Sequence, residues 1–143
     1  MIKRILIVGL ILTMGITFVC SVFAEDANNS EPIVSRYSYA LTTKCSIRIS
    51  GNKAICIGYA SSQDYSTNTN VTITLQKKAS GTTNWANVCS WSASASGTRE
   101  AIVRESKTIS TGYDYRIQMY WKISNSSGTI LENGTEYSNV VSY

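Results

Sequence analysis

Apolar and polar residues alternate in a series of short runs that cover most of the chain after residue 36. This period of two is typical of β-strands that pack one face against a core and leave the other in water. Clusters of Ser, Thr, Asn and Gly, which favour turns, separate the runs, and almost no stretch has helical spacing. The pattern predicts an all-β antiparallel sandwich of seven strands, at residues 42–50, 53–60, 70–78, 85–95, 99–109, 113–124 and 129–143.

The clearest alternation lies in the sixth run. One set of its positions is predicted to face the core: Tyr115, Ile117, Met119, Trp121 and Ile123. The positions between them face water: Asp114, Arg116, Gln118, Tyr120 and Lys122. The third run alternates in the same way from Val71 to Lys78. We therefore expect these two strands to pair at the centre of a sheet with one dry and one wet face.

Two tryptophans in the fourth run, Trp85 and Trp91, are six residues apart, which places them on the same side of a regular strand. Val88 would then lie on the opposite side. A β-bulge or an edge position would let Val88 and Trp91 both pack inward, because a bulge inserts one extra residue into the strand.

The segment STGYDYRIQ places Gly112 three residues before Tyr115, at the start of the sixth run. It resembles the tyrosine corner of immunoglobulin-like and fibronectin type III sandwiches, in which a tyrosine hydroxyl bonds to backbone just upstream. We predict this structural role for Tyr115. The inter-sheet disulfide of antibody domains is not expected, because Ile117 occupies the position of its second cysteine.

The first 24 residues have the pattern of an export signal. Lys3 and Arg4 precede an apolar run at residues 5–19, and Val22-Phe23-Ala24 offers a cleavage site. The apolar run is shorter than the roughly 20 residues that a membrane-spanning helix needs. We predict a signal peptide at residues 1–24, a flexible leader at 25–36 and one β-sandwich domain at 37–143. The protein is then secreted and can associate with the cell surface, and membrane contact is expected only through the uncleaved signal.

Composition excludes several functional classes. The chain has no His, which removes Ser-His-Asp and Cys-His nucleophile pairs and imidazole zinc sites. Glu100, Glu105 and Asp114 show no motif spacing, and neither a phosphate loop nor a calcium loop occurs. We therefore predict that the protein is not an enzyme and holds no metal or cofactor.

The charge balance gives no indication of nucleic acid binding. Loss of Lys3 and Arg4 with the signal leaves eleven Lys and Arg against nine Asp and Glu, so the formal net charge falls from +4 to +2. The aromatic and basic patterns of RNA and DNA readers are also missing. We expect no nucleic acid partner.

Three of the four cysteines remain after cleavage, and export favours a disulfide. The segment CSIRISGNKAIC has the pattern of one hairpin, which makes Cys45 and Cys56 the preferred pair. With residues 51–52 as a two-residue turn, the two sulfurs are diagonal neighbours on one face, and a bulge or longer turn would bring them directly opposite. Two small buried thiols are the alternative. Cys89 is either a buried hydrophobe or a thiol available to a partner.

Several segments together carry a resemblance that spans nearly the whole mature chain: CSIRISGNKAICIGYA, VTITLQKKASGTTNWANVCSW, SASASG, TGYDYRI and SNVVSY. With the signal peptide they resemble a family of small secreted proteins of Firmicutes. The resemblance implies a single immunoglobulin-like sandwich exported by a Gram-positive bacterium, and it supplies no catalytic residues. The chain departs from the family at Cys89, where a paired or absent cysteine is more usual, and in the RESK run at residues 104–107.

Two functional classes stay open. In the first, the protein is a non-catalytic binding module whose polar sheet face carries four candidate binding residues: Lys78, Arg116, Tyr120 and Lys122. Tyr120 would stack on a sugar, and the cations would bind phosphate of a cell-wall polymer. A glycan and another surface protein are the other candidate partners, and an ordinary solvated sheet face is the alternative for each residue.

In the second class, the protein is a secreted toxin-like or protein-interaction factor. It would act through loops such as SSQDYSTNTN or through an edge strand. Salt-sensitive surface binding, as against capture of a defined protein, would separate the two classes.

Overall fold

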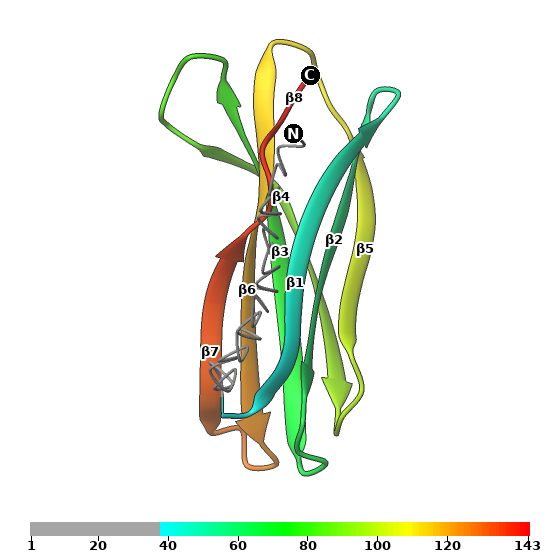
Figure 1. Cartoon of the computed structure of the whole chain (residues 1–143), viewed down its shortest axis with the longest axis vertical. Coiled ribbons are helices and arrows are strands. Elements are labelled where there is room, and N and C mark those ends of the chain that lie inside the picture. The colour runs from blue at the N-terminus through cyan, green and yellow to red at the C-terminus, as the bar shows by residue number, and fades with distance from the viewer. Residues whose placement is uncertain (1–37) are drawn as a thin grey trace, which may run out of the picture. The chain divides into compact units, whose positions relative to one another are not determined.

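The computed structural model describes residues 38–143 (Figure 1). The predicted signal peptide and leader lie outside the described residues. The described part contains eight strands: β1 (Ala40–Ser50), β2 (Lys53–Ser62), β3 (Thr67–Ala79), β4 (Ala86–Ser96), β5 (Ala101–Thr108), β6 (Tyr113–Asn125), β7 (Ile130–Tyr137) and β8 (Val141–Ser142). In this part of the chain no helix is suited to crossing a membrane.

The strands form two antiparallel sheets (Figure 1). The smaller sheet has the order β1-β2-β5, and the larger has the order β4-β3-β6-β7, with β8 paired to β6. β3 and β6 pair over thirteen residues at the centre of the larger sheet. The predicted all-β architecture with antiparallel strands is therefore confirmed, and so is the central pairing of these two strands.

The last predicted strand, residues 129–143, is divided into β7 and β8. Between them the Ser138 hydroxyl accepts the Ile117 N–H at 2.8 Å, and the Ser138 N–H donates to the Ile117 carbonyl at 3.0 Å. The next residue, Asn139, turns its amide toward β1 and bonds both the N–H and the C=O of Ile47. Between β7 and β8, side chains therefore bond to backbone groups that would otherwise pair with another strand. Hydrophobic alternation could not predict these bonds.

The core lies between the two sheets, and every predicted core position of β6 is buried: Tyr115, Ile117, Met119, Trp121 and Ile123. Gly58 in β2 permits the sheets to approach closely, because a Cβ there would collide with the Ile73 side chain and lie 3.1 Å from the Met119 sulfur. Gly134 in β7 acts within one sheet: it is the register partner of Trp121 and leaves room for that ring to lie across β7, since a Cβ at Gly134 would lie 2.7 Å from the ring. Glycine is required at both positions by space.

A β-bulge interrupts β4. Its pairing with β3 shifts between Leu75 and Gln76, and Val88 is left without a partner in the register. Val88 and Trp91 both pack against the core, so the bulge acts as the sequence suggested. The extra residue also moves Trp85, just before β4, to the outer side of the sheet, where its ring faces cations. The sequence prediction that Trp85 lies on the same side as Trp91 is therefore wrong, because the bulge reverses the side of the residues that precede Val88.

Tyr115 makes the contacts expected of a corner tyrosine. Its side chain is buried, and its hydroxyl donates to the Ser110 carbonyl at 2.8 Å and accepts the Ser110 N–H at 3.1 Å. These bonds tie the start of β6 to the segment that follows β5.

Candidate functional site

The outer side of the larger sheet, called the polar face below, carries the four predicted binding residues. Its side chains on β3 and β6 alternate with the buried core positions, and most of them are amides or hydroxyls, while Lys78, Asp114, Arg116 and Lys122 are charged. The face comprises Asn87, Ser90, Ser92, Ser94 and Ser96 with Trp85 on the β4 side, Asn68, Asn70, Thr72, Thr74, Gln76 and Lys78 on β3, Asp114, Arg116, Gln118, Tyr120, Lys122 and Ser124 on β6, and Asn133, Thr135 and Tyr137 on β7.

A ladder of side-chain hydrogen bonds crosses from β3 to β4 on this face. Asn70 donates to Ser94, and the hydroxyl pairs Thr72–Ser92 and Thr74–Ser90 are each separated by 2.8 Å. Asn68 accepts a bond from Ser96 at 2.7 Å in the next row. Because these groups hold one another, the face offers an ordered row of hydroxyl and amide groups to solvent.

Arg116 lies between two aromatic rings at one end of the polar face. Its guanidinium carbon is 4.2 Å from the centroid of Trp85 and 4.3 Å from that of Tyr137. Its Nε donates to Gln76 Oε1 at 2.9 Å. A guanidinium held between rings and fixed by a hydrogen bond has little freedom, so the three side chains form a rigid unit. We call Trp85, Arg116 and Tyr137 the aromatic stack.

Gln76 connects the aromatic stack to its neighbours. Besides accepting from Arg116, its amide nitrogen donates to Asn87 at 3.0 Å and to Gln118 at 3.1 Å. Gln118 in turn donates to the Tyr137 hydroxyl at 3.2 Å. This network spans four strands and fixes the orientation of the stack, which places it among the most organised side-chain clusters of the polar face.

Lys78 is engaged by its own neighbours. Its ammonium forms an ion pair with Asp114 at 2.9 Å, donates to the Thr82 carbonyl at 2.9 Å and lies 5.4 Å from the Trp85 ring centroid. Hydrogen bonds from Ser142 and from Lys78 hold the pKa of Asp114 below its ordinary value. Lys78 is thus mainly a structural cation.

Tyr120 and Lys122 lie further along β6. Tyr120 is 39% exposed and is flanked by Thr72 and Thr135 in the register. Lys122 is half-buried and lies between Asn70 and Asn133. The structure therefore places all four predicted residues on one face, with Lys78 and Arg116 at one end and Tyr120 with Lys122 beyond them.

Sequence reasoning did not find two members of the site, Trp85 and Tyr137. Trp85 was misplaced because the bulge at Val88 reverses its side. Tyr137, which is 51% exposed, belonged to a run whose register was not defined by alternation. The sequence did contain one signal for Tyr137: it is an aromatic residue directly before Ser138 and Asn139, which interrupt the predicted strand at residues 129–143.

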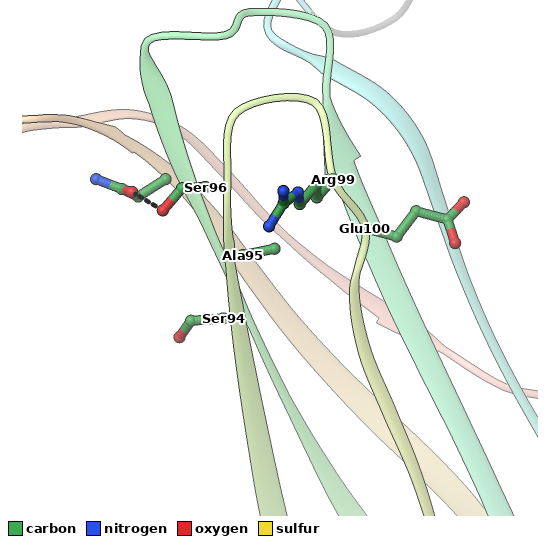
Figure 2. Close-up of a pocket in the computed structure, with 6 residues that line it drawn as sticks. Ser94, Ala95, Ser96, Arg99 and Glu100 are labelled. Atoms are coloured by element: carbon green, nitrogen blue, oxygen red, sulfur yellow. Dashed lines mark hydrogen bonds between the residues drawn. The ribbon is translucent and has the colours of Figure 1, made fainter.

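A pocket lies where the polar face reaches the β4–β5 connection, which crosses from the larger sheet to the smaller one (Figure 2). It is lined by Asn68, Ser94, Ala95, Ser96, Arg99 and Glu100. Figure 2 shows Arg99 extending toward Ala95 while Glu100 points away. The pocket continues the hydroxyl ladder and adds one cation to it.

Within residues 38–143, Cys45, Cys56 and Cys89 are free thiols, so the structure does not contain the predicted bridge between Cys45 and Cys56. The hairpin has the two-residue turn, so Cys45 is opposite Gly58 and Cys56 is opposite Ile47. Diagonal neighbours in a sheet have Cα atoms roughly 7–8 Å apart, whereas a disulfide requires about 4.4–6.8 Å. The register thus accounts for the missing bridge.

Burial controls the chemistry of these thiols. It raises the pKa of Cys56 to about 12, with a further contribution from Cys89, and it raises the pKa of Cys45 to about 11, with a contribution from Glu136. The pKa of Cys89 is also raised by burial, although Lys107 opposes the shift. All three therefore remain protonated at neutral pH. Within residues 38–143, no group of three His, Cys, Asp or Glu side chains is placed to hold a metal ion.

Comparison with known proteins gives no relative. No family model matches the chain, and neither a curated protein nor a solved structure does.

Proposed function

We propose that the protein is an exported, non-catalytic β-sandwich of the immunoglobulin-like class. The strand order supports this proposal, because β1, β2 and β5 form one sheet while β3, β6 and β7 belong to the other. In an immunoglobulin sandwich, the first, second and fifth strands pair in one sheet and the third, sixth and seventh in the other. The corner contact of Tyr115 is a second support. Export and a Gram-positive source rest on the signal sequence and the family resemblance.

The polar face is the proposed binding surface, and a cell-surface glycan is its proposed ligand. The observation that carries the proposal is the aromatic stack, in which Arg116 is fixed between Trp85 and Tyr137 beside a hydroxyl and amide ladder. Exposed rings provide stacking surfaces for sugars, while oriented amides and hydroxyls hydrogen-bond to sugar hydroxyls. Tyr120 adds a third ring toward the middle of the face.

A glycan fits this face better than a phosphate-rich wall polymer does. Lys78 is neutralised by Asp114, and Arg116 is occupied by two rings and Gln76. Of the sequence-predicted cations, Lys122 alone has neither an ion pair nor a ring contact within the described residues. Binding should therefore depend on stacking and hydrogen bonds, which salt screens weakly.

Sedimentation with isolated Gram-positive cell walls tests the proposal. Walls would be used before and after removal of phosphate-containing polymers by hydrofluoric acid, each at low and high salt. The wild-type protein should sediment with both preparations and at both salt concentrations. Tyr120→Ala and Tyr137→Ala should each weaken binding by about fivefold, as expected for loss of one stacking contact of about 1 kcal/mol.

The matched control is Tyr65→Ala. Tyr65 is 85% exposed in the β2–β3 loop and lies outside the polar face. This variant should sediment like the wild type. Binding that disappears with the phosphate polymer, or that falls equally in Tyr65→Ala and Tyr120→Ala, would contradict a glycan site on this face.

The same loop favours a second candidate function, recognition of a protein partner. Asp64 accepts bonds from the Ser66 N–H and hydroxyl at 2.8 Å, and Thr67 bonds to the Ser62 hydroxyl. These contacts order the loop and leave Tyr65 exposed at its tip. Capture of one defined protein that is lost in Tyr65→Ala and kept in Tyr120→Ala would support this function over glycan binding.

A further inference from the structure

The outer side of the smaller sheet has a different chemistry from the polar face. Alternation places twelve side chains on it, in four rows across β1, β2 and β5. The rows are Lys44, Tyr59 and Ile102; Ser46, Ile57 and Arg104; Arg48, Ile55 and Ser106; and Ser50, Lys53 and Thr108. Each row contains one cation, and no row contains a carboxylate. We call these twelve residues the cationic face.

Apolar side chains form the middle of the cationic face. Ile55, Ile57 and Tyr59 follow one another on the central strand β2, and Ile102 on β5 is 42% exposed. Lys44 and Arg48 flank this ridge on β1, and Arg104 flanks it on β5. An apolar ridge bordered on both sides by cations is a pattern that an ordinary solvated sheet face does not require.

The four cations lack partners of opposite charge in the described part of the chain. The ion pair found there joins Lys78 to Asp114 on the other sheet. Glu105, the nearest acid in sequence to Arg104, alternates to the inner side of β5, opposite Cys56. Ion pairs within residues 38–143 therefore leave the four cations of the face unpaired.

We propose that the cationic face binds the surface of a bilayer that contains anionic phospholipid. The charge requires an anionic partner, which excludes a second copy of the same face, since four cations would then meet four cations. The cations are spread one to a row, so the partner must present negative charge over a plane. Mobile lipid headgroups can bring a phosphate to each cation, while the isoleucines and Tyr59 enter the shallow apolar region beneath.

This contact goes beyond the proposed glycan function, and it uses the opposite side of the sandwich. It also differs from the sequence expectation, which limited membrane contact to the signal segment. A protein bound in this way would keep the polar face directed away from the bilayer, because the two faces are on the outer sides of the two sheets.

Co-sedimentation of the mature protein with vesicles tests the proposal. Vesicles of phosphatidylcholine alone are compared with vesicles of equal parts phosphatidylcholine and phosphatidylglycerol. The wild-type protein should bind the second kind and not the first. Arg48→Glu/Arg104→Glu should lower the partition coefficient at least about thirtyfold, since each basic residue near an anionic surface contributes about fivefold.

The matched control is Arg99→Glu/Lys107→Glu, which makes the same charge change outside the cationic face. It should lower binding by no more than about threefold, because Lys107 alternates to the opposite side of β5 and Arg99 precedes that strand, so that both charges are directed away from the bilayer and salt weakens their effect. Ile102→Ser, which keeps the charge, should lower binding about fivefold through loss of apolar contact. Circular dichroism would establish that each variant is folded.

Four results would overturn the proposal. They are no binding of the wild type to the anionic vesicles, equal binding to both kinds of vesicle, equal losses in the two double variants, and no loss in Ile102→Ser. Arg48→Glu/Arg104→Glu is also tested on cell walls treated with hydrofluoric acid. If this variant keeps wall binding and loses vesicle binding, the lipid-binding surface is separate from the glycan site. The lipid proposal and the glycan proposal can therefore fail independently.

Discussion

Trp85 and Trp91 lie on opposite sides of the larger sheet although six residues separate them. Val88 causes this, because it occupies a bulge and takes no partner on β3. Trp91 therefore packs against the core, while Trp85 stacks on Arg116 on the polar face. One inserted residue thus supplies the core with one tryptophan and the candidate site with the other.

Replacing Trp91 should mainly lower stability, whereas replacing Trp85 should mainly weaken wall binding. Trp91→Ala should lower the free energy of unfolding by about 2–4 kcal/mol, because it leaves a cavity at the edge of the core. Trp85→Ala should cost about 1 kcal/mol through loss of the ring contact with Arg116, yet it should weaken wall binding. Guanidinium denaturation measures the first effect and wall sedimentation the second. Equal destabilisation by both would contradict the assignment of their sides.

Tyr115→Phe should lower the free energy of unfolding by about 1–2 kcal/mol. The change removes the hydroxyl that bonds both the N–H and the C=O of Ser110 and leaves the core volume almost unchanged. Urea denaturation checks the value. Tyr120→Phe is the control, since its exposed hydroxyl has no such role, and it should unfold like the wild type.

Gly134→Ala should destabilise the protein by about 1–3 kcal/mol, because the new methyl group would lie 2.7 Å from the ring of buried Trp121. Thr135→Ala changes the neighbouring position on the outer side of β7 and should cost much less. Thermal unfolding of the two variants compares them. If Gly134→Ala melted at the wild-type temperature, the close packing of Trp121 on β7 would be wrong.

The buried thiol of Cys56 should make stability fall at alkaline pH. Its pKa is about 12 in the folded protein and about 8.5 in an unfolded chain. A group with a raised folded pKa contributes stability that is complete below the unfolded value and is lost as pH rises toward the folded value. The denaturation midpoint should therefore decrease between about pH 8.5 and 11.

Tyrosines and lysines titrate in the same range, so Cys56→Ala supplies the comparison. This variant should be less stable than the wild type at neutral pH. Above about pH 8.5, where a thiol in an unfolded chain ionises, its free energy of unfolding should fall less than that of the wild type. Identical pH dependence in the two proteins would show that Cys56 ionises normally when folded.

Alternation predicted the fold class and the central pair of strands because both depend on burial, which repeats every two residues. It placed Lys78, Arg116, Tyr120 and Lys122 on one outer face for the same reason. Alternation could not predict contacts at positions where the strand is interrupted or bulged, because side-chain direction there no longer repeats every two residues. The Asn139 amide that reaches Ile47 is one example, and the bulge that carries Trp85 outward is another.

The cationic face was missed for a related reason. Its cations come from three strands, and none of those strands is notably basic by itself. Arg48 and Arg104 become neighbours of the same apolar ridge only when β1 and β5 pair on either side of β2. Strand order, which pattern alone does not specify, therefore decides the charge of a sheet face.

The central claim is that the polar face binds glycan, and a titration followed by nuclear magnetic resonance tests it most directly. Nitrogen-15-labelled mature protein would be titrated with soluble glycan fragments from the cell wall. If the polar face binds glycan, the resonances of the Trp85 indole N–H, the Arg116 Nε–H and the Gln118 side-chain amide should shift together and saturate. Shifts confined to the loop around Tyr65 or to β1, β2 and β5, or none at all, would contradict it.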